Sequence, residues 1–93
     1  MGNRPCALVT GASRGIGRAI AERLIADGMH VINFDKAEPA EISTHESFYE
    51  VDVSDEKVLR AALADVTSKF TITRLVNNAG IVRPATIEKT TIA

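Results

Sequence analysis

Three glycines stand close together near the start of the chain, in the segment TGASRGIG at positions 10–17. The apolar run before them, residues 6–10, is typical of a buried parallel strand, and a helical pattern opens inside the glycine segment. Glycines leave the main-chain N–H groups at a helix N-terminus uncovered by side chains, and such a terminus attracts phosphate groups. The segment therefore predicts a pyrophosphate-binding turn, although Gly11 or Gly17 alone would equally serve an ordinary tight turn.

An acidic residue follows at a distance that suits the same ligand. Asp35 lies 18 residues beyond Gly17, at the end of a second apolar run, residues 30–34. An acid about 20 residues after such glycines accepts hydrogen bonds from the hydroxyls of an adenosine ribose. Taken alone, Asp35 is a solvated loop acid. Together with the glycine segment, it predicts a ribose site.

Two amphipathic helices are predicted to position these residues. Apolar residues at helical spacing indicate helices over residues 16–27 and about 54–69. Ser54 is expected to cap the second helix, because a serine hydroxyl accepts a hydrogen bond from a free N–H group of the first turn. Favourable i,i+4 ion pairs are expected on the wet face of that helix: Glu56 with Arg60 and Asp65 with Lys69.

Further strands are predicted over residues 47–51 and 74–77, where short apolar runs recur. Residues 36–46 carry several acids and little periodicity, so we expect a surface loop with at most one helical turn. The order strand, helix, strand, strand, helix, strand indicates an α/β protein with a parallel sheet and right-handed crossovers.

Composition narrows the class of protein. The chain has 93 residues, a formal net charge of -1 and 45% hydrophobic residues, as expected for one small globular domain. Its charge gives no reason to expect nucleic acid or an anionic membrane as partner. No apolar run approaches a membrane span, and the single Cys6 favours a reducing compartment, so we expect a cytoplasmic protein. His30 and His45 have no partners at metal-ligand spacing, and no metal site is predicted.

Two more polar segments follow predicted strands, at the strand ends where ligands of open α/β sheets bind. They are Asp52-Val53 and Asn77-Asn78-Ala79-Gly80. Together with the glycine segment and Asp35, these motifs resemble the short-chain dehydrogenase/reductase family. The resemblance covers essentially the whole chain.

The resemblance implies a three-layer Rossmann-like parallel sheet with strand order 3-2-1-4. It also implies that residues 1–93 are the N-terminal part of a single NAD(P)-binding domain, because family members are usually well over twice this length. Their catalytic Ser, Tyr and Lys lie downstream of the Asn-Asn-Ala-Gly motif. Tyr49, the only tyrosine here, precedes Val53 rather than a lysine at the fourth following position, so no catalytic residue is assigned to this chain.

Site residues can be carried over position by position. The glycine segment would cradle the pyrophosphate, with the Ile16 N–H among the donors and Gly17 allowing close helix packing. Asp52 would bind the adenine amino group and Val53 the ring edge. Asn78 would either lie along the cofactor or brace the central strands. The complete set of expected cofactor-binding residues is Gly11, Ser13, Arg14, Gly15, Ile16, Gly17, Asp35, Lys36, Asp52, Val53, Asn78, Ala79 and Gly80.

NAD is the expected cofactor, with NADP less favoured, because Asp35 would repel a 2′-phosphate while Arg14 and Lys36 are the bases that could attract one. The implied activity is hydride transfer between this cofactor and a small-molecule carbonyl or secondary alcohol, in a protein that is a homo-oligomer at full length. Two alternatives stay open. One is a nucleotide-binding or scaffold protein without catalysis, and the other is a methyltransferase using S-adenosylmethionine, which the glycine spacing and Asn-Asn-Ala-Gly disfavour.

Overall fold

The computed structural model describes residues 4–78, which form four strands and two helices. All strand pairs are parallel, and the strand order is β3-β2-β1-β4. This confirms the order expected from the family resemblance. In chain order the elements are β1 (Cys6–Thr10), α1 (Gly15–Ala26), β2 (His30–Asp35), β3 (Glu46–Glu50), α2 (Glu56–Lys69) and β4 (Ile72–Asn77).

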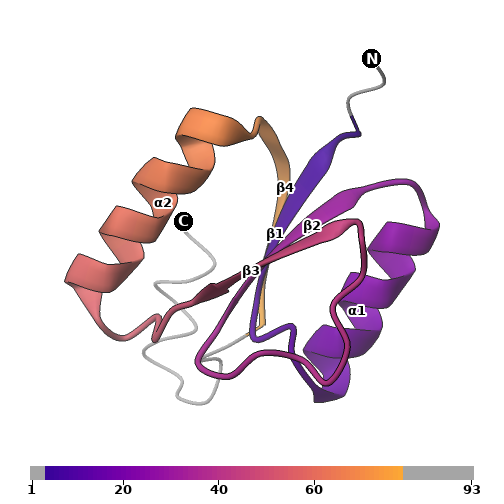
Figure 1. Cartoon of the computed structure of the whole chain (residues 1–93), viewed down its shortest axis with the longest axis horizontal. Coiled ribbons are helices and arrows are strands. Elements are labelled where there is room, and N and C mark those ends of the chain that lie inside the picture. The colour runs from indigo at the N-terminus through magenta and orange to yellow at the C-terminus, as the bar shows by residue number, and fades with distance from the viewer. Residues whose placement is uncertain (1–3, 79–93) are drawn as a thin grey trace.

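The sheet is the middle of three layers, with α1 on one face and α2 on the other (Figure 1). Successive residues of a strand point to opposite faces, so β1 supplies both cores. Ala7 and Val9 pack in the α1 layer, whereas Leu8 packs with Ile32 and Phe34 in the α2 layer. The three-layer architecture is therefore confirmed.

The two central strands are the most buried elements. Every residue of β1 is buried, as are the four inner residues of β2. Strands covered on both faces become apolar throughout, which is why Cys6–Thr10 could be recognised from the sequence. Their burial gives the loops that follow β1 and β2 a rigid base.

Several element ends differ from the predictions. Strands β3 and β4 begin earlier than expected, at Glu46 and Ile72, and residues 36–45 form the expected loop, without a helix. Helix α2 is capped by Asp55, whose carboxylate accepts a hydrogen bond from the Val58 N–H at 3.3 Å. Ser54 is not the cap, because its hydroxyl donates to the Asp52 carboxylate at 2.6 Å instead.

The exposed face of α2 carries both expected ion pairs. Arg60 Nη2 lies 2.6 Å from Glu56 Oε2, and Lys69 Nζ lies 3.1 Å from Asp65 Oδ2. Such exposed helix pairs contribute only about 0.3–0.5 kcal/mol each, so the buried faces of the helix dominate its stability. Neither α1 nor α2, the helices of the described range 4–78, is long and apolar enough to cross a membrane.

Candidate functional site

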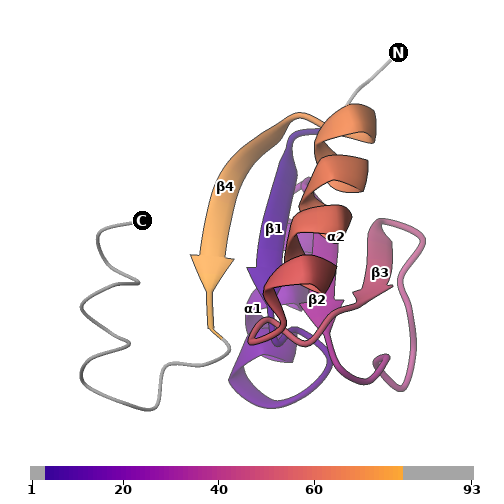
Figure 2. The ribbon, with the colours of Figure 1, turned by 90° about the vertical axis from the view of Figure 1, so that its left-hand side faces the viewer.

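The four strands run in the same direction, so their carboxyl ends lie along one edge of the sheet (Figure 2). The segments that leave this edge are the glycine loop (residues 11–14), Asp35 and its successors, Asp52-Val53 after β3, and Asn78 after β4. These are the positions that the sequence predicted to bind a ligand. Open α/β sheets place their ligands at this edge.

Three successive N–H groups tie the glycine loop to strand β2. The Gly11 N–H donates to the Phe34 carbonyl at 2.8 Å, and the Ala12 N–H donates to Asn33 Oδ1 at 3.2 Å. The Ser13 N–H donates to Asp35 Oδ2 at 2.9 Å. The loop is therefore held in one conformation against the rest of the edge.

Gly15 opens helix α1 in a conformation that favours glycine. Its φ is +63°, and a Cβ built there would have no atom within 4 Å. The preceding N-cap, Arg14, is extended and makes no side-chain capping hydrogen bond. The N-terminus of α1 thus lacks both a side-chain cap and a covering Cβ, which are the conditions under which a helix start binds an anion. These residues fit the diphosphate of a dinucleotide.

Gly17 is required by close packing inside the protein. A Cβ at this position would lie 1.9 Å from the Gly11 carbonyl oxygen and 2.7 Å from Asn78 Nδ2. Nonbonded atoms cannot approach so closely, so a side chain at Gly17 would force α1 away from the loop. The close helix packing expected of Gly17 is what the structure shows.

Asp35 is half-buried at the end of β2, and both its carboxylate oxygens are held by backbone. Oδ2 accepts from the Ser13 N–H, and Oδ1 accepts from the Lys36 N–H at 2.7 Å. Each oxygen retains further acceptor capacity for a ligand hydroxyl. The two nearby bases, Arg14 and Lys36, are both exposed.

Asp52 is exposed at the end of β3 and is organised by its own turn. Its Oδ1 accepts hydrogen bonds from both the hydroxyl and the N–H of Ser54, at 2.6 and 3.0 Å. These bonds, from the hydroxyl first, hold the pKa of the Asp52 carboxyl below its usual value. Val53 packs against the core of the α2 layer. The pair thus lies at the expected edge, with its carboxylate fixed.

Asn78 braces the ends of β1 and β4. Its N–H donates to Thr10 Oγ1 at 3.0 Å, and its Nδ2 donates to the Gly11 carbonyl at 3.3 Å. Thr10 Oγ1 in turn donates to Asn77 Oδ1 at 3.1 Å. Of the two roles expected for Asn78, bracing is the one the described residues display. Ala79 and Gly80 lie outside the described residues.

Two residues beside the site were missed by the sequence predictions. Asn33 is fully buried in β2, where its side chain binds the glycine loop, and Glu46 is buried at the start of β3. Glu46 was expected in a surface loop, an expectation that is wrong because its carboxylate pairs with Arg18 of α1. The available signal was Asn33 itself, a polar residue inside the apolar run HVINF.

Two hollows lie on the surface along α1. One, of about 270 Å³, is lined partly by Arg18 and Glu22, and the other, of about 350 Å³, is lined by apolar residues that include Ile16 and Ile20. Neither of these two hollows is lined by Asp35 or Asp52. Within residues 4–78, no cluster of His, Cys, Asp and Glu side chains is arranged to hold a metal ion.

Comparison with known proteins identifies the family. The model of the short chain dehydrogenase family matches residues 5–93 of this chain. The chain therefore belongs to the short-chain dehydrogenases.

Several curated enzymes are similar in sequence. The 3-oxoacyl-(acyl-carrier-protein) reductase of Staphylococcus aureus (strain Mu50) is 44% identical over 88 residues, which cover 83% of this chain and 36% of that protein. The acetoacetyl-CoA reductase of Shinella zoogloeoides is 42% identical over 91 residues, covering 91% of this chain and 38% of that protein. The chain thus spans little more than a third of the length of these relatives.

Solved structures give the same result for the fold. The ligand-free aldohexose dehydrogenase of Thermoplasma acidophilum matches with a TM-score of 0.78 and 39% identity, over 85% of this chain and 31% of that one. A 4-hydroxyisoleucine dehydrogenase complexed with NADH has a TM-score of 0.73 at 22% identity, over 83% of this chain and 34% of that one. The Rossmann-like fold of the short-chain dehydrogenases is therefore shown for this chain.

Proposed function

We propose that this chain is the dinucleotide-binding part of an oxidoreductase that transfers hydride between NAD and a carbonyl or secondary alcohol. The observation that carries the proposal is the Ser13–Asp35 hydrogen bond, which joins a helix N-terminus suited to phosphate to an acid suited to ribose. When bound, the cofactor would supply or accept the hydride. The residues of this chain bind and orient it.

Each part of the edge has a proposed role. The N-terminus of α1, from Gly15 to Gly17, holds the diphosphate through N–H groups that include that of Ile16. Asp35 accepts hydrogen bonds from the adenosine ribose hydroxyls. Asp52 binds the adenine amino group while Val53 borders the ring. The remaining proposed contacts are Gly11, Ser13, Arg14, Lys36, Asn78, Ala79 and Gly80.

The preference for NAD over NADP rests on Asp35. Two backbone N–H groups hold its carboxylate in place, so the side chain does not simply turn away from a 2′-phosphate. A like-charge contact costs about 4 kcal/mol at 4 Å for an effective dielectric near 20. The attraction between the 2′-phosphate and an exposed Arg14 or Lys36 contributes only about 1 kcal/mol. Repulsion therefore exceeds attraction.

The names of the relatives support an enzyme rather than a scaffold protein. Those relatives are called 3-oxoacyl-(acyl-carrier-protein) reductase and acetoacetyl-CoA reductase, so a small carbonyl compound is the proposed substrate class. Residues 1–93 are proposed as the N-terminal part of one cofactor-binding domain, with the catalytic residues outside it. The intact protein is proposed to be a cytoplasmic homo-oligomer.

One assay tests this function directly. NADH is added to the intact protein that carries this chain, and its fluorescence on binding is followed, after which a short 3-oxoacyl thioester is supplied. Saturable binding followed by thioester-dependent loss of NADH is expected. Absence of binding of both NADH and NADPH would refute the cofactor assignment, and binding without oxidation of NADH by any carbonyl compound tested would favour the scaffold alternative.

A further inference from the structure

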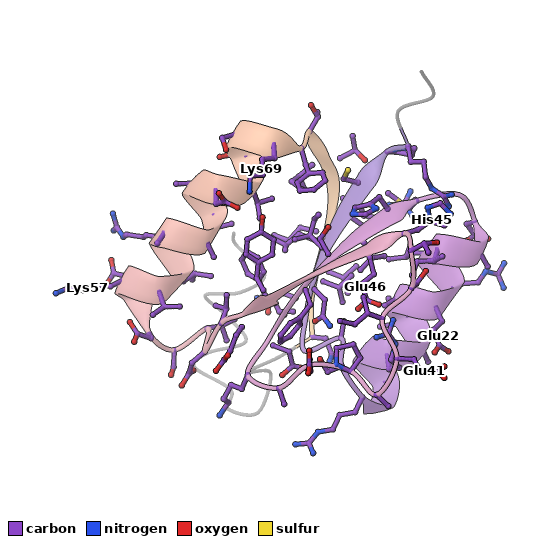
Figure 3. All side chains as sticks on the ribbon, viewed as in Figure 1. Glu22, Glu41, His45, Glu46, Lys57 and Lys69 are labelled. Carbon is purple, nitrogen blue, oxygen red and sulfur yellow. The ribbon has the colours of Figure 1, made fainter. Side chains whose placement is uncertain are left out.

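A buried ion pair lies behind the glycine loop. The Arg18 guanidinium of α1 donates two hydrogen bonds to the Glu46 carboxylate of β3, from Nη1 at 3.0 Å and from Nη2 at 2.9 Å. The Glu46 side chain has no exposed surface and that of Arg18 is 16% exposed. Figure 3 shows Glu46 on the α1 side of the sheet, in contrast to Lys57, which extends from α2 into solvent.

Asn33 connects this ion pair to the glycine loop. On one side its Nδ2 donates to Glu46 Oε2 at 3.1 Å. On the other, its Oδ1 accepts from the Ala12 N–H at 3.2 Å, and its Nδ2 also reaches Ser13 Oγ at 3.1 Å. A continuous chain of hydrogen bonds therefore runs from α1 through β3 and β2 into the loop.

The polarity of this chain fixes how Asn33 is turned. A side-chain amide has a donor end and an acceptor end, and its contacts decide which way it faces. A carboxylate only accepts, so the Glu46 oxygen requires the NH₂ end of Asn33. The amide oxygen must then face the glycine loop, where it meets the Ala12 N–H. Glu46 thus determines which way the Asn33 amide faces, and so places Asn33 Oδ1 against the Ala12 N–H.

Stability alone does not account for this arrangement. A buried ion pair contributes little net stability, because desolvation of both charges offsets their attraction. Buried polar networks are better suited to selecting one geometry. The geometry selected here is that of Ala12 and Ser13, and Ser13 also contacts Asp35 through its N–H and the Ala37 carbonyl through its hydroxyl. Both halves of the candidate site depend on where Ser13 lies.

We propose that Glu46, held by Arg18, is a positioning residue that orients Asn33 and thereby fixes the glycine loop in its cofactor-binding conformation. The proposal deepens the proposed function and rests on it. Glu46 touches no ligand in this scheme. It acts through Asn33, on the N–H groups of the loop.

Hydrogen exchange of the ligand-free intact protein tests the positioning without any cofactor. In Glu46→Gln, the carboxamide can place an NH₂ group against Asn33, which removes the orienting contact. The Ala12 and Ser13 amides are expected to exchange about tenfold faster, the size expected for loss of one hydrogen bond to a charged group. The Val9 amide of β1 should keep its rate. The proposal would be overturned if exchange became equally faster at the Ala12, Ser13 and Val9 amides, or if it became faster at none of them.

Glu22→Gln is the matched control. Glu22 is the other carboxylate beside Arg18, at 3.6 Å from Nε, but its side chain is 69% exposed and has no contact with Asn33. This change should leave exchange at Ala12 and Ser13 as in the wild type. Where Glu46→Gln does not yield folded protein, Arg18→Lys serves the same test, because lysine keeps the charge but lacks the two-pronged contact.

Cofactor binding provides the second measurement. Glu46→Gln is expected to raise the KM for NADH about tenfold while kcat at saturating NADH stays within about twofold. Val66→Ala, which creates a cavity in the core of the α2 layer, controls for lowered stability and should leave the KM for NADH unchanged. An unchanged KM in Glu46→Gln would overturn the positioning role. Failure of the wild type to bind NADH or NADPH would instead refute the proposed function, and the exchange rates would still decide on the loop.

Discussion

The Ser13 N–H donates to the Asp35 carboxylate at 2.9 Å, although the two residues are 22 positions apart in the chain. Ser13 belongs to the glycine loop after β1, and Asp35 closes β2. Because β1 and β2 are parallel neighbours in register, the two strand ends meet at one edge. The hydrogen bond makes the phosphate-side loop and the ribose-side acid a single unit, so a change in one should be felt at the other.

Cofactor choice should follow the charge of Asp35. The wild-type protein is expected to show a higher kcat/KM with NAD than with NADP. Asp35→Ala should narrow the gap, because it removes both the like charge near a 2′-phosphate and a ribose hydrogen bond of roughly 1.5–3 kcal/mol. Steady-state kinetics with both cofactors measure the effect.

Glu38→Ala is the control for this prediction. Glu38 is an exposed acid in the same loop, three residues beyond Asp35. Its removal should leave the cofactor preference unchanged. An equal kcat/KM for NAD and NADP in the wild type, or a preference for NADP, would contradict the role given to Asp35.

Gly15 and Gly17 should respond differently to the same substitution. Gly15→Ala places its methyl group in open space at a cost of about 1–2 kcal/mol for the left-handed backbone, so the fold should survive while NADH affinity falls. Gly17→Ala drives a methyl group into the Gly11 carbonyl and should lower the unfolding temperature sharply. Thermal unfolding and NADH titration of both variants separate the effects. Equal loss of stability in the two would contradict this division of roles.

The pKa of Tyr49 should be raised, and its value should depend on the contact with Asp65 of α2. Burial, together with its hydrogen bond to the Asp65 carboxylate, raises the pKa of Tyr49 from 10 to about 12. A pKa raised on folding favours the neutral phenol. Its stabilising contribution is therefore complete below about pH 10 and is lost as the pH rises through about 12.

The Tyr49 ring shift in NMR spectra, recorded against pH, measures this titration. Asp65→Asn removes the negative charge beside the phenol and should lower the pKa of Tyr49 toward 10. Glu56→Gln, an exposed acid on the same helix, should leave it unchanged. A wild-type midpoint near 10 would contradict the half-buried position of Tyr49 and its hydrogen bond to Asp65.

Strand β4 should make residues 1–93 prone to association when they are produced alone. It is an edge strand of the described sheet, and its Leu75 is 57% exposed. An apolar edge with unpaired N–H and C=O groups invites pairing between molecules. Leu75→Lys should reduce association, since a charged residue discourages such pairing. Sedimentation shows the effect, and a monodisperse, cooperatively melting wild-type segment would contradict it.

The sheet could be predicted because its signals are local and strong. The apolar runs of β1 and β2 mark strands that are buried on both faces, and the glycine segment fixes where α1 begins. Gly11, Gly15 and Asp35 are recognisable because each combines a residue type with a spacing. The strand order came with the family resemblance, since the pattern of elements alone leaves several orders possible.

Polar contacts between distant segments could not be predicted in this way. Ser54 and Asp55 are both good caps by type, and the choice depends on Asp52, which attracts the Ser54 hydroxyl. From the sequence, Glu46 is predicted to be a loop acid. In the fold, the crossover helix α1 places Arg18 beside it. A single sequence shows that such a residue is charged but not that its partner lies 28 positions away.

A crystal structure of the intact protein with NAD bound tests the central claim most directly. The diphosphate is expected at the N-terminus of α1, within hydrogen-bond distance of the Ile16 N–H, and the adenosine ribose hydroxyls on the Asp35 carboxylate. The adenine amino group should lie within hydrogen-bond distance of the Asp52 carboxylate, with Val53 at the edge of the ring. A dinucleotide bound elsewhere, or one whose diphosphate makes no contact with the glycine segment, would contradict it.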